Sequence, residues 1–124
     1  MNNGNRHDFE VKYRFLSSAE GGRKIGTPFQ GYRSDWAYEG GDIKKTGIYM
    51  IHPEFLDSNG NVLAENIRAP IEGVARMRIL SQELREIIHK GKIKIGVKGF
   101  FMEGGRRVAE AEVIKVVGLS DNET

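Results

Sequence analysis

The sequence predicts a small all-β protein, a closed antiparallel β-barrel formed by most of its 124 residues. Apolar and charged residues alternate with a period of two at residues 9–15 and again at 93–97, which places the apolar side chains of each stretch on one face of a strand. Glycine-rich turns separate the apolar stretches, and one stretch alone has the spacing of a helix. Many short strands joined by glycine-rich turns are typical of closed antiparallel barrels.

The predicted strands follow in chain order. The first covers residues 9–15, where four large apolar residues alternate with three charged ones. Residues 93–97 show the same alternation, so both stretches are expected to present one apolar face to a core. Four further apolar stretches are candidate strands: 36–38, 48–51, 75–80 and 109–117.

The last candidate strand changes phase along its length. Ala109, Ala111 and Val113 share one face under strict alternation, whereas Ile114 and Val116 fall on the other. A β-bulge would shift the alternation by one residue, and cover on both faces at that end would also explain it. Both explanations are open at this point.

Two segments between the strands carry turn and helix signals. Asn59-Gly60 predicts a hairpin with a type I′ turn, which needs positive φ at both central residues. Residues 81–91 predict one or two helical turns, with Ser81 as the N-cap and Gly91 as the stop. At most one short helix is therefore expected.

Composition limits the class of protein. The chain can bury one modest core, so we expect a single domain over residues 7–119 with disordered ends at 1–6 and 120–124. It has no cysteine, which excludes disulfides and thiolate chemistry and suits a reducing compartment. No apolar run approaches the length of about 18 residues that a membrane span needs. We expect a cytoplasmic protein without a membrane partner.

No residue pattern indicates catalysis. The three histidines do not have the spacing of a metal site, and the chain has no Gly-x-x-x-x-Gly-Lys-Ser/Thr motif to hold a triphosphate. The polar stretch 57–61 lacks the glutamate that would close a calcium loop, because Arg68 stands at that position. We expect a protein that is not an enzyme and that uses no metal and no cofactor.

The most specific pattern is a tetrapeptide that occurs twice. It stands at Glu20-Gly21-Gly22-Arg23 and at Glu103-Gly104-Gly105-Arg106. Glycine adopts positive φ without steric cost, so each copy predicts a turn with an arginine at its rim. The first copy is followed by Thr27-Pro28-Phe29 and Gly31-Tyr32-Arg33, and the second by an apolar strand. In this order the motifs resemble the third, C-terminal β-barrel domain of elongation factor Tu.

The resemblance covers two parts of the chain, residues 9–38 and 91–119. Residues 46–73 have no counterpart in the family domain and are treated as an insert. Ile25-Gly26 is a smaller insertion within the first motif. The chain shows nothing like the GTPase domain of that family, so GTP hydrolysis is not expected.

The resemblance implies an RNA-facing rim, because the family domain contacts the T-stem of aminoacyl-tRNA there. Lys24 and Lys44 stand where the family has His and Thr and would suit a phosphate, whereas Asp35 replaces Gln and would repel one. Arg23 and Arg106 are expected to lie close together and to form a shared positive spot. The full expected rim is Arg23, Lys24, Arg33, Lys44, Glu103, Gly104 and Arg106.

Two functions of different classes remain open. The first is a protein-interaction module that uses the insert, with Asp57, Asn59 and Asn61 as contact residues. The second is a translation-linked module that binds tRNA, rRNA or a translation factor through the rim. Residues 34–72 carry seven acidic and three basic groups, which opposes RNA and suits a basic protein surface, whereas the motifs favour RNA. We expect a protein partner and keep RNA as the alternative; the oligomeric state is left open.

Several of these residues also have a purely structural interpretation. Gly-Gly-Arg turns are often hairpin turns with a solvated arginine. Tyr32 would then pack at the end of the barrel with Arg33 paired to a carboxylate, and Trp36 would belong to the core. A row formed by Lys92, Lys94 and Lys98 would be the solvated face of a strand.

Overall fold

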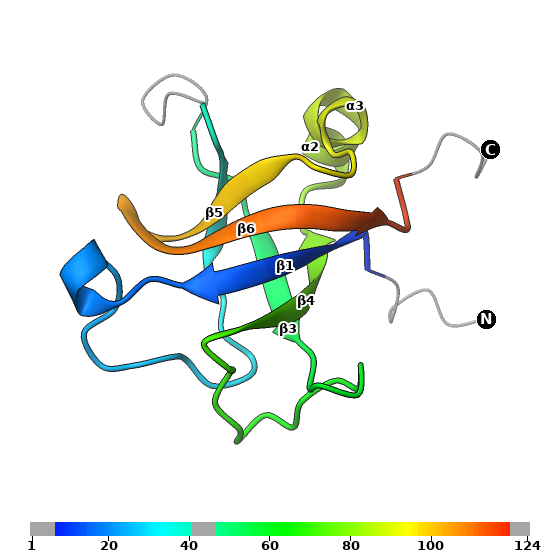
Figure 1. Cartoon of the computed structure of the whole chain (residues 1–124). Coiled ribbons are helices and arrows are strands. Elements are labelled where there is room, and N and C mark those ends of the chain that lie inside the picture. The colour runs from blue at the N-terminus through cyan, green and yellow to red at the C-terminus, as the bar shows by residue number, and fades with distance from the viewer. Residues whose placement is uncertain (1–6, 41–46, 120–124) are drawn as a thin grey trace.

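The computed structural model describes residues 7–40 and 47–119, and its main feature is one antiparallel sheet of six strands (Figure 1). The strand order in the sheet is β2-β5-β6-β1-β4-β3. The predicted mostly-β fold is therefore confirmed. The strands are β1 (Phe9–Phe15), β2 (Asp35–Tyr38), β3 (Ile51–Phe55), β4 (Glu72–Ile79), β5 (Lys98–Glu103) and β6 (Arg106–Val116).

The sheet curls around a core of aromatic and aliphatic side chains. The four large apolar residues of β1 are all buried, as their alternation predicts, and the charged residues between them face outward. Trp36 is fully buried and packs edge to face against Phe9, with ring centroids 5.6 Å apart. The structural interpretation of Trp36 as a core residue is therefore correct.

The two edge strands of the sheet, β2 and β3, approach each other without forming a ladder. Trp36 and Tyr49 form one antiparallel bridge with two hydrogen bonds of 2.8 Å. Beyond it, the side-chain amide of Gln30 accepts a hydrogen bond from the Phe55 amide and donates one to the Phe55 carbonyl, both at 2.9 Å. His52 Nδ1 lies 2.8 Å from the Ser34 carbonyl oxygen. The sheet is thus strongly curled, with side chains rather than strand pairing along most of its seam.

Irregularities in β6 explain its change of phase. β1 pairs with β6 in a register that shifts between Glu10, opposite Lys115, and Val11, opposite Val113. Ile114 is the extra residue of the resulting bulge, and its side chain is exposed while Val113 is buried. Of the two explanations left open by the sequence, the β-bulge is the one that the structure shows.

The strand predicted at 93–97 is wrong. These residues form a turn, in which Val97 donates a hydrogen bond to the Lys94 carbonyl and Gly96 has a φ of 95°. Ile93 is buried but Ile95 is highly exposed, so the alternation does not mark one face of a strand. Pairing begins at Lys98, where β5 starts. The stretch predicted at 48–51 likewise contributes only its last residue to β3.

The single helical segment is longer than predicted. It runs through α2 (Gln82–Leu84), a π-helical turn (Arg85–His89) and α3 (Lys90–Lys92), about three turns in all. The Ser81 side chain caps its start, as expected, but Gly91 lies inside the last turn rather than ending the helix. A single short 3-10 turn (Ser18–Glu20) is the other helical piece of the described chain. No helix in residues 7–40 and 47–119 has the length and apolarity to cross a membrane.

A buried polar contact attaches the helix to the sheet. The Tyr38 hydroxyl and His89 Nδ1 are hydrogen-bonded at 2.6 Å, and the Tyr49 ring packs edge to face on the imidazole. Burial lowers the pKa of His89 to about 4, so the imidazole is neutral at neutral pH. Lys92 lies over the Tyr38 ring rather than on the solvated face of a strand. This end of the sheet is remote in Figure 1 from the end that carries the two glycine turns.

Candidate functional site: the rim with the two glycine turns

The two Glu-Gly-Gly-Arg turns lie side by side, as the resemblance implies. The Arg23 guanidinium donates a hydrogen bond to the carboxylate of Glu103, which belongs to the second turn. The Tyr32 hydroxyl donates to the same carboxylate oxygen, and the Arg23 guanidinium lies 5.2 Å from the Tyr32 ring centroid. Arg23 also donates to the Gly26 carbonyl at 2.8 Å. The positive charge of Arg23 is therefore neutralised within the rim.

The first turn follows the short 3-10 helix. Ser17 and Glu20 form a capping box, and Gly21 ends the helix with a φ of 91°. Glu20 is also bound by Arg14, at 3.1 Å to each carboxylate oxygen. Hydrogen bonds from Arg14, together with those from Ser17, lower the pKa of Glu20 to about 2. Gly22 packs against the chain at Leu16 so closely that a Cβ would lie 2.2 Å from the Leu16 carbonyl oxygen.

The second turn is a two-residue hairpin that joins β5 to β6. Glu103 and Arg106 are paired across it, and Gly104 has a φ of 59° while Gly105 has no positive φ. That pattern is typical of a type II′ turn. Arg106 is exposed and forms no ion pair with the described residues.

The other predicted rim residues are dispersed. Lys24 and Arg33 are exposed and make no ion pair within residues 7–40 and 47–119, so the carboxylate partner expected for Arg33 is not found there. Tyr32 packs at the end of the core as expected, stacked on Phe55 with centroids 6.5 Å apart. Lys44 lies outside the described residues. The expected shared positive spot is therefore reduced, because Arg23 is paired with Glu103.

The insert pairs directly with the first motif, a contact that the sequence did not reveal. Phe29 and Arg68 form an isolated antiparallel bridge, and neighbouring backbone bonds of 2.9 Å and 2.8 Å join Gln30 to Ile67 and Ala69 to Pro28. The Arg68 guanidinium lies 4.5 Å from the Phe29 ring centroid and donates to the Thr27 carbonyl. Part of the insert, residues 67–69, therefore lies against the first motif, whereas the predicted contact residues Asp57, Asn59 and Asn61 form a separate turn.

A hollow of about 600 Å³ opens where the two segments meet. Its lining includes Ile25, which is 76% exposed, and Ile71, which is 65% exposed. Phe29 and Ile67, beside it, are also about half exposed. Sequence reasoning missed these residues because they lie in loops without periodicity; the only available signal was apolar side chains at 25, 67 and 71 in otherwise polar segments. We call Lys24, Ile25, Phe29, Ile67, Arg68 and Ile71 the rim–insert surface.

The tip of the insert is a turn that its own aspartate organises. The Asp57 carboxylate accepts hydrogen bonds from the backbone amides of Asn59 and Asn61, both at 2.9 Å. Gly60 has a φ of 84°, but Asn59 has no positive φ, so the predicted type I′ turn is wrong. The bonds from Gly60 to Asp57 and from Asp57 to Asn61 instead indicate a type I turn followed by a left-handed glycine. The side chains left exposed for contact are those of Asn59 and Asn61.

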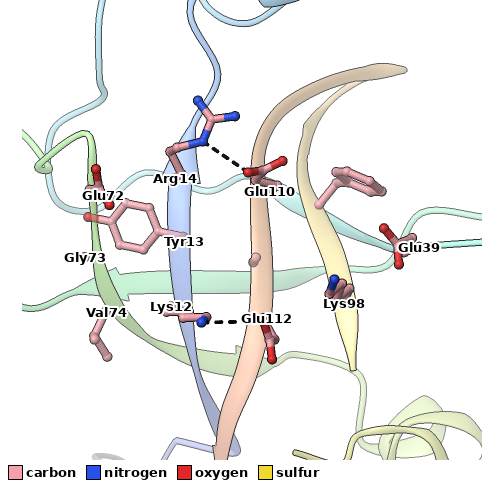
Figure 2. Close-up of a pocket in the computed structure, with 12 residues that line it drawn as sticks. Lys12, Tyr13, Arg14, Glu39, Glu72, Gly73, Val74, Lys98, Glu110 and Glu112 are labelled. Atoms are coloured by element: carbon pink, nitrogen blue, oxygen red, sulfur yellow. Dashed lines mark hydrogen bonds and ion pairs between the residues drawn. The ribbon is translucent and has the colours of Figure 1, made fainter. Parts of the chain in front are cut away.

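A second hollow lies on the outer face of the sheet (Figure 2). Cross-strand ion pairs line it, Lys12 with Glu112 at 3.6 Å and Arg14 with Glu110 at 3.1 Å. Glu39, Glu72 and Lys98 contribute further charges of both signs. This mixture of charges does not favour a polyanion, and no cluster among residues 7–40 and 47–119 has enough His, Asp and Glu to hold a metal ion. The rim–insert surface is therefore the better candidate site.

Comparisons with known proteins add no identification. No protein-family model and no curated protein matches the chain. The resemblance to the elongation factor Tu domain thus stays a prediction that depends on the quoted motifs.

Proposed function

We propose that the chain is a non-enzymatic binding module that binds a protein partner through the rim–insert surface. The observation that carries the proposal is the pair of isoleucines, Ile25 and Ile71, exposed on two loops that line one hollow. Exposed apolar side chains around a concavity are typical of protein contact sites. The partner would bind in the cytoplasm, away from membranes.

The geometry of the rim supports a protein partner over RNA. Arg23, which the resemblance assigns to RNA, is bound by Glu103 and by the Gly26 carbonyl. Freeing it for a phosphate would leave Glu103 without its cation. Nucleic-acid affinity depends on several such phosphate contacts, so this loss weighs against RNA.

The alternative is a translation-linked module that binds tRNA, rRNA or a translation factor. Its support is that Lys24, Arg33 and Arg106 are exposed and lack ion pairs within the described residues. The proposed likeness to the elongation factor Tu domain also includes full barrel closure. The bridge between Trp36 and Tyr49 and the Gln30 amide support closure of the seam.

Capture from a lysate of the source cell tests the proposal with matched variants. The full chain should retain a protein partner after ribonuclease treatment, and Ile71→Asp should lose it. Ile87→Asp is the control, because Ile87 is just as exposed but lies on the helical segment. Retention of the partner by Ile71→Asp would contradict the proposal. Loss of the partner on ribonuclease treatment, together with loss in Arg106→Glu, would instead support the RNA alternative.

A further inference from the structure

The hollow lined by Ile25 and Ile71 has two positively charged side chains without a negatively charged partner in the described chain. Five charged side chains line it. Arg14 pairs with Glu20 and Glu110, and Arg23 pairs with Glu103. The two that remain, Lys24 and Arg68, have no carboxylate partner within the described residues.

The two cations are held differently. Arg68 is fixed by the Thr27 carbonyl and the Phe29 ring, so its guanidinium has a defined position beside the hollow. Lys24 is exposed and makes no contact of this kind. A fixed guanidinium and an exposed ammonium around one concavity can bind carboxylates that approach together.

Apolar side chains line the same hollow as the two cations. Ile25 follows Lys24 directly in the chain, and Ile71 lies on the same insert segment as Arg68. The Phe15 amide donates a 2.7 Å hydrogen bond to the Ile71 carbonyl, which fixes the backbone that carries this isoleucine. The hollow thus combines apolar contact with two positive positions.

We propose that the partner segment is an acidic peptide that places a large apolar side chain in this hollow and carboxylates at Lys24 and Arg68. This inference rests on the proposed function and identifies the chemistry of the partner. It follows from charge complementarity, since an apolar ligand alone would leave both cations without a counter-charge. RNA fits less well, because bases stack on exposed aromatic rings, and the exposed large apolar side chains lining this hollow are those of Ile25 and Ile71.

The direct test uses defined peptides and the full chain. The probe is a short peptide in which glutamates alternate with leucines around one phenylalanine; the matched peptide has glutamine in place of every glutamate. The acidic peptide should bind about tenfold more tightly or better, with affinity that falls as salt is added. Its addition should shift the methyl resonances of Ile25 and Ile71. Equal binding of both peptides, or shifts confined to other methyl groups, would overturn the inference.

Charge-reversal variants localise the effect. Lys24→Glu should weaken the acidic peptide about tenfold, as the loss of one close charge pair implies. Lys94→Glu makes the same change in net charge on the turn before β5 and should have little effect. Equal loss in both variants would show attraction to net charge only and would refute the site. Shifts of the two isoleucines by an RNA oligonucleotide, with none from the acidic peptide, would also refute it.

Capture of the natural partner by the Lys24→Glu and Ile71→Asp variants distinguishes failure of this inference from failure of the proposed function. A captured protein that requires Ile71 but binds Lys24→Glu normally would leave the proposed function standing and overturn acidic recognition. Capture that survives Ile71→Asp would instead overturn the proposed function.

Discussion

The two Glu-Gly-Gly-Arg turns have the same four residues and opposite roles. In the first turn the arginine is fixed, because Arg23 is bound to Glu103 of the other copy. In the second turn the glutamate is fixed by that same contact, and Arg106 is left exposed without an ion pair to the described residues. One ion pair therefore uses the arginine of one copy and the glutamate of the other.

The difference comes from what precedes each turn. A 3-10 helix leads into the first copy, which places Glu20 beside Arg14 and brings Gly22 against Leu16. A strand leads into the second, so Gly104 and Gly105 form a plain hairpin between β5 and β6. A local motif thus predicts that the chain turns, but the function of its side chains depends on the neighbours that the fold supplies.

The largest expected difference in stability is between alanine variants of the second glycine of each copy. Gly22→Ala should lower the free energy of unfolding by about 3 kcal/mol, because its Cβ would overlap the Leu16 carbonyl. Gly105→Ala meets no atom within 4 Å and should change stability by less than about 1 kcal/mol. Urea unfolding of both variants measures the contrast. Equal losses would show that the two turns are equivalent after all.

The second largest expected difference in stability is between alanine variants of the two glutamates. Glu103→Ala removes the shared acceptor of Arg23 and Tyr32 and should cost about 2 kcal/mol, since two partly buried donors lose their partner. Glu20→Ala should cost less, because its pairing with Arg14 is exposed to solvent. Chemical denaturation compares them under one condition. A larger loss in Glu20→Ala would reverse our assignment of the structural contact.

Alanine variants of the two arginines should show a smaller difference in stability, again with the larger loss at the residue of the Arg23–Glu103 pair. Arg23→Ala should cost about 1 kcal/mol, because the side chain is only 16% exposed and its loss leaves Glu103 to Tyr32 alone. Arg106→Ala should change stability by less than about 0.5 kcal/mol, as exposed positions usually do. Thermal unfolding of the pair provides the measurement. A destabilised Arg106→Ala would reveal a contact of Arg106 that the fold does not account for.

The smallest effect concerns protonation of the first turn. Because the folded pKa of Glu20 is lowered to about 2 from 4.5, its contribution to stability is present above pH 4.5 and is lost as the pH falls toward 2. The carboxyl should titrate with a midpoint near 2 in an NMR pH series. Arg14→Gln should move that midpoint back toward 4.5, since Arg14 is the main cause of the shift. A midpoint that stays near 2 in the variant would assign the shift to Ser17 instead.

Local patterns predicted local structure well. The alternation at 9–15 and the Ser81 N-cap could be predicted, because each depends on residues close together in the chain. The change of phase near Ile114 was also visible, but the choice between a bulge and two-sided cover needed the pairing of β6 with β1. The alternation at 93–97 misled, since a glycine with positive φ breaks the chain direction before pairing starts.

The candidate site was only partly predictable for the same reason. Proximity of the two turns followed from the resemblance, but the pairing of Arg23 with Glu103 joins residues 80 positions apart. The bridge between Phe29 and Arg68 likewise depends on the fold around the insert. No local pattern contains such contacts, so the sequence indicated a rim and an insert but not that residues 67–69 of the insert pair with the first motif.

The Gln30 amide has a consequence for how the protein behaves among copies of itself. An edge strand with free amide and carbonyl groups is a template for pairing with another chain, and β3 is such an edge. Gln30 occupies both the amide and the carbonyl of Phe55, and its amide nitrogen also reaches the Leu63 carbonyl. At Phe55 one side chain thus takes the place that a neighbouring molecule's backbone would otherwise fill, so this end of β3 is closed to edge-to-edge pairing.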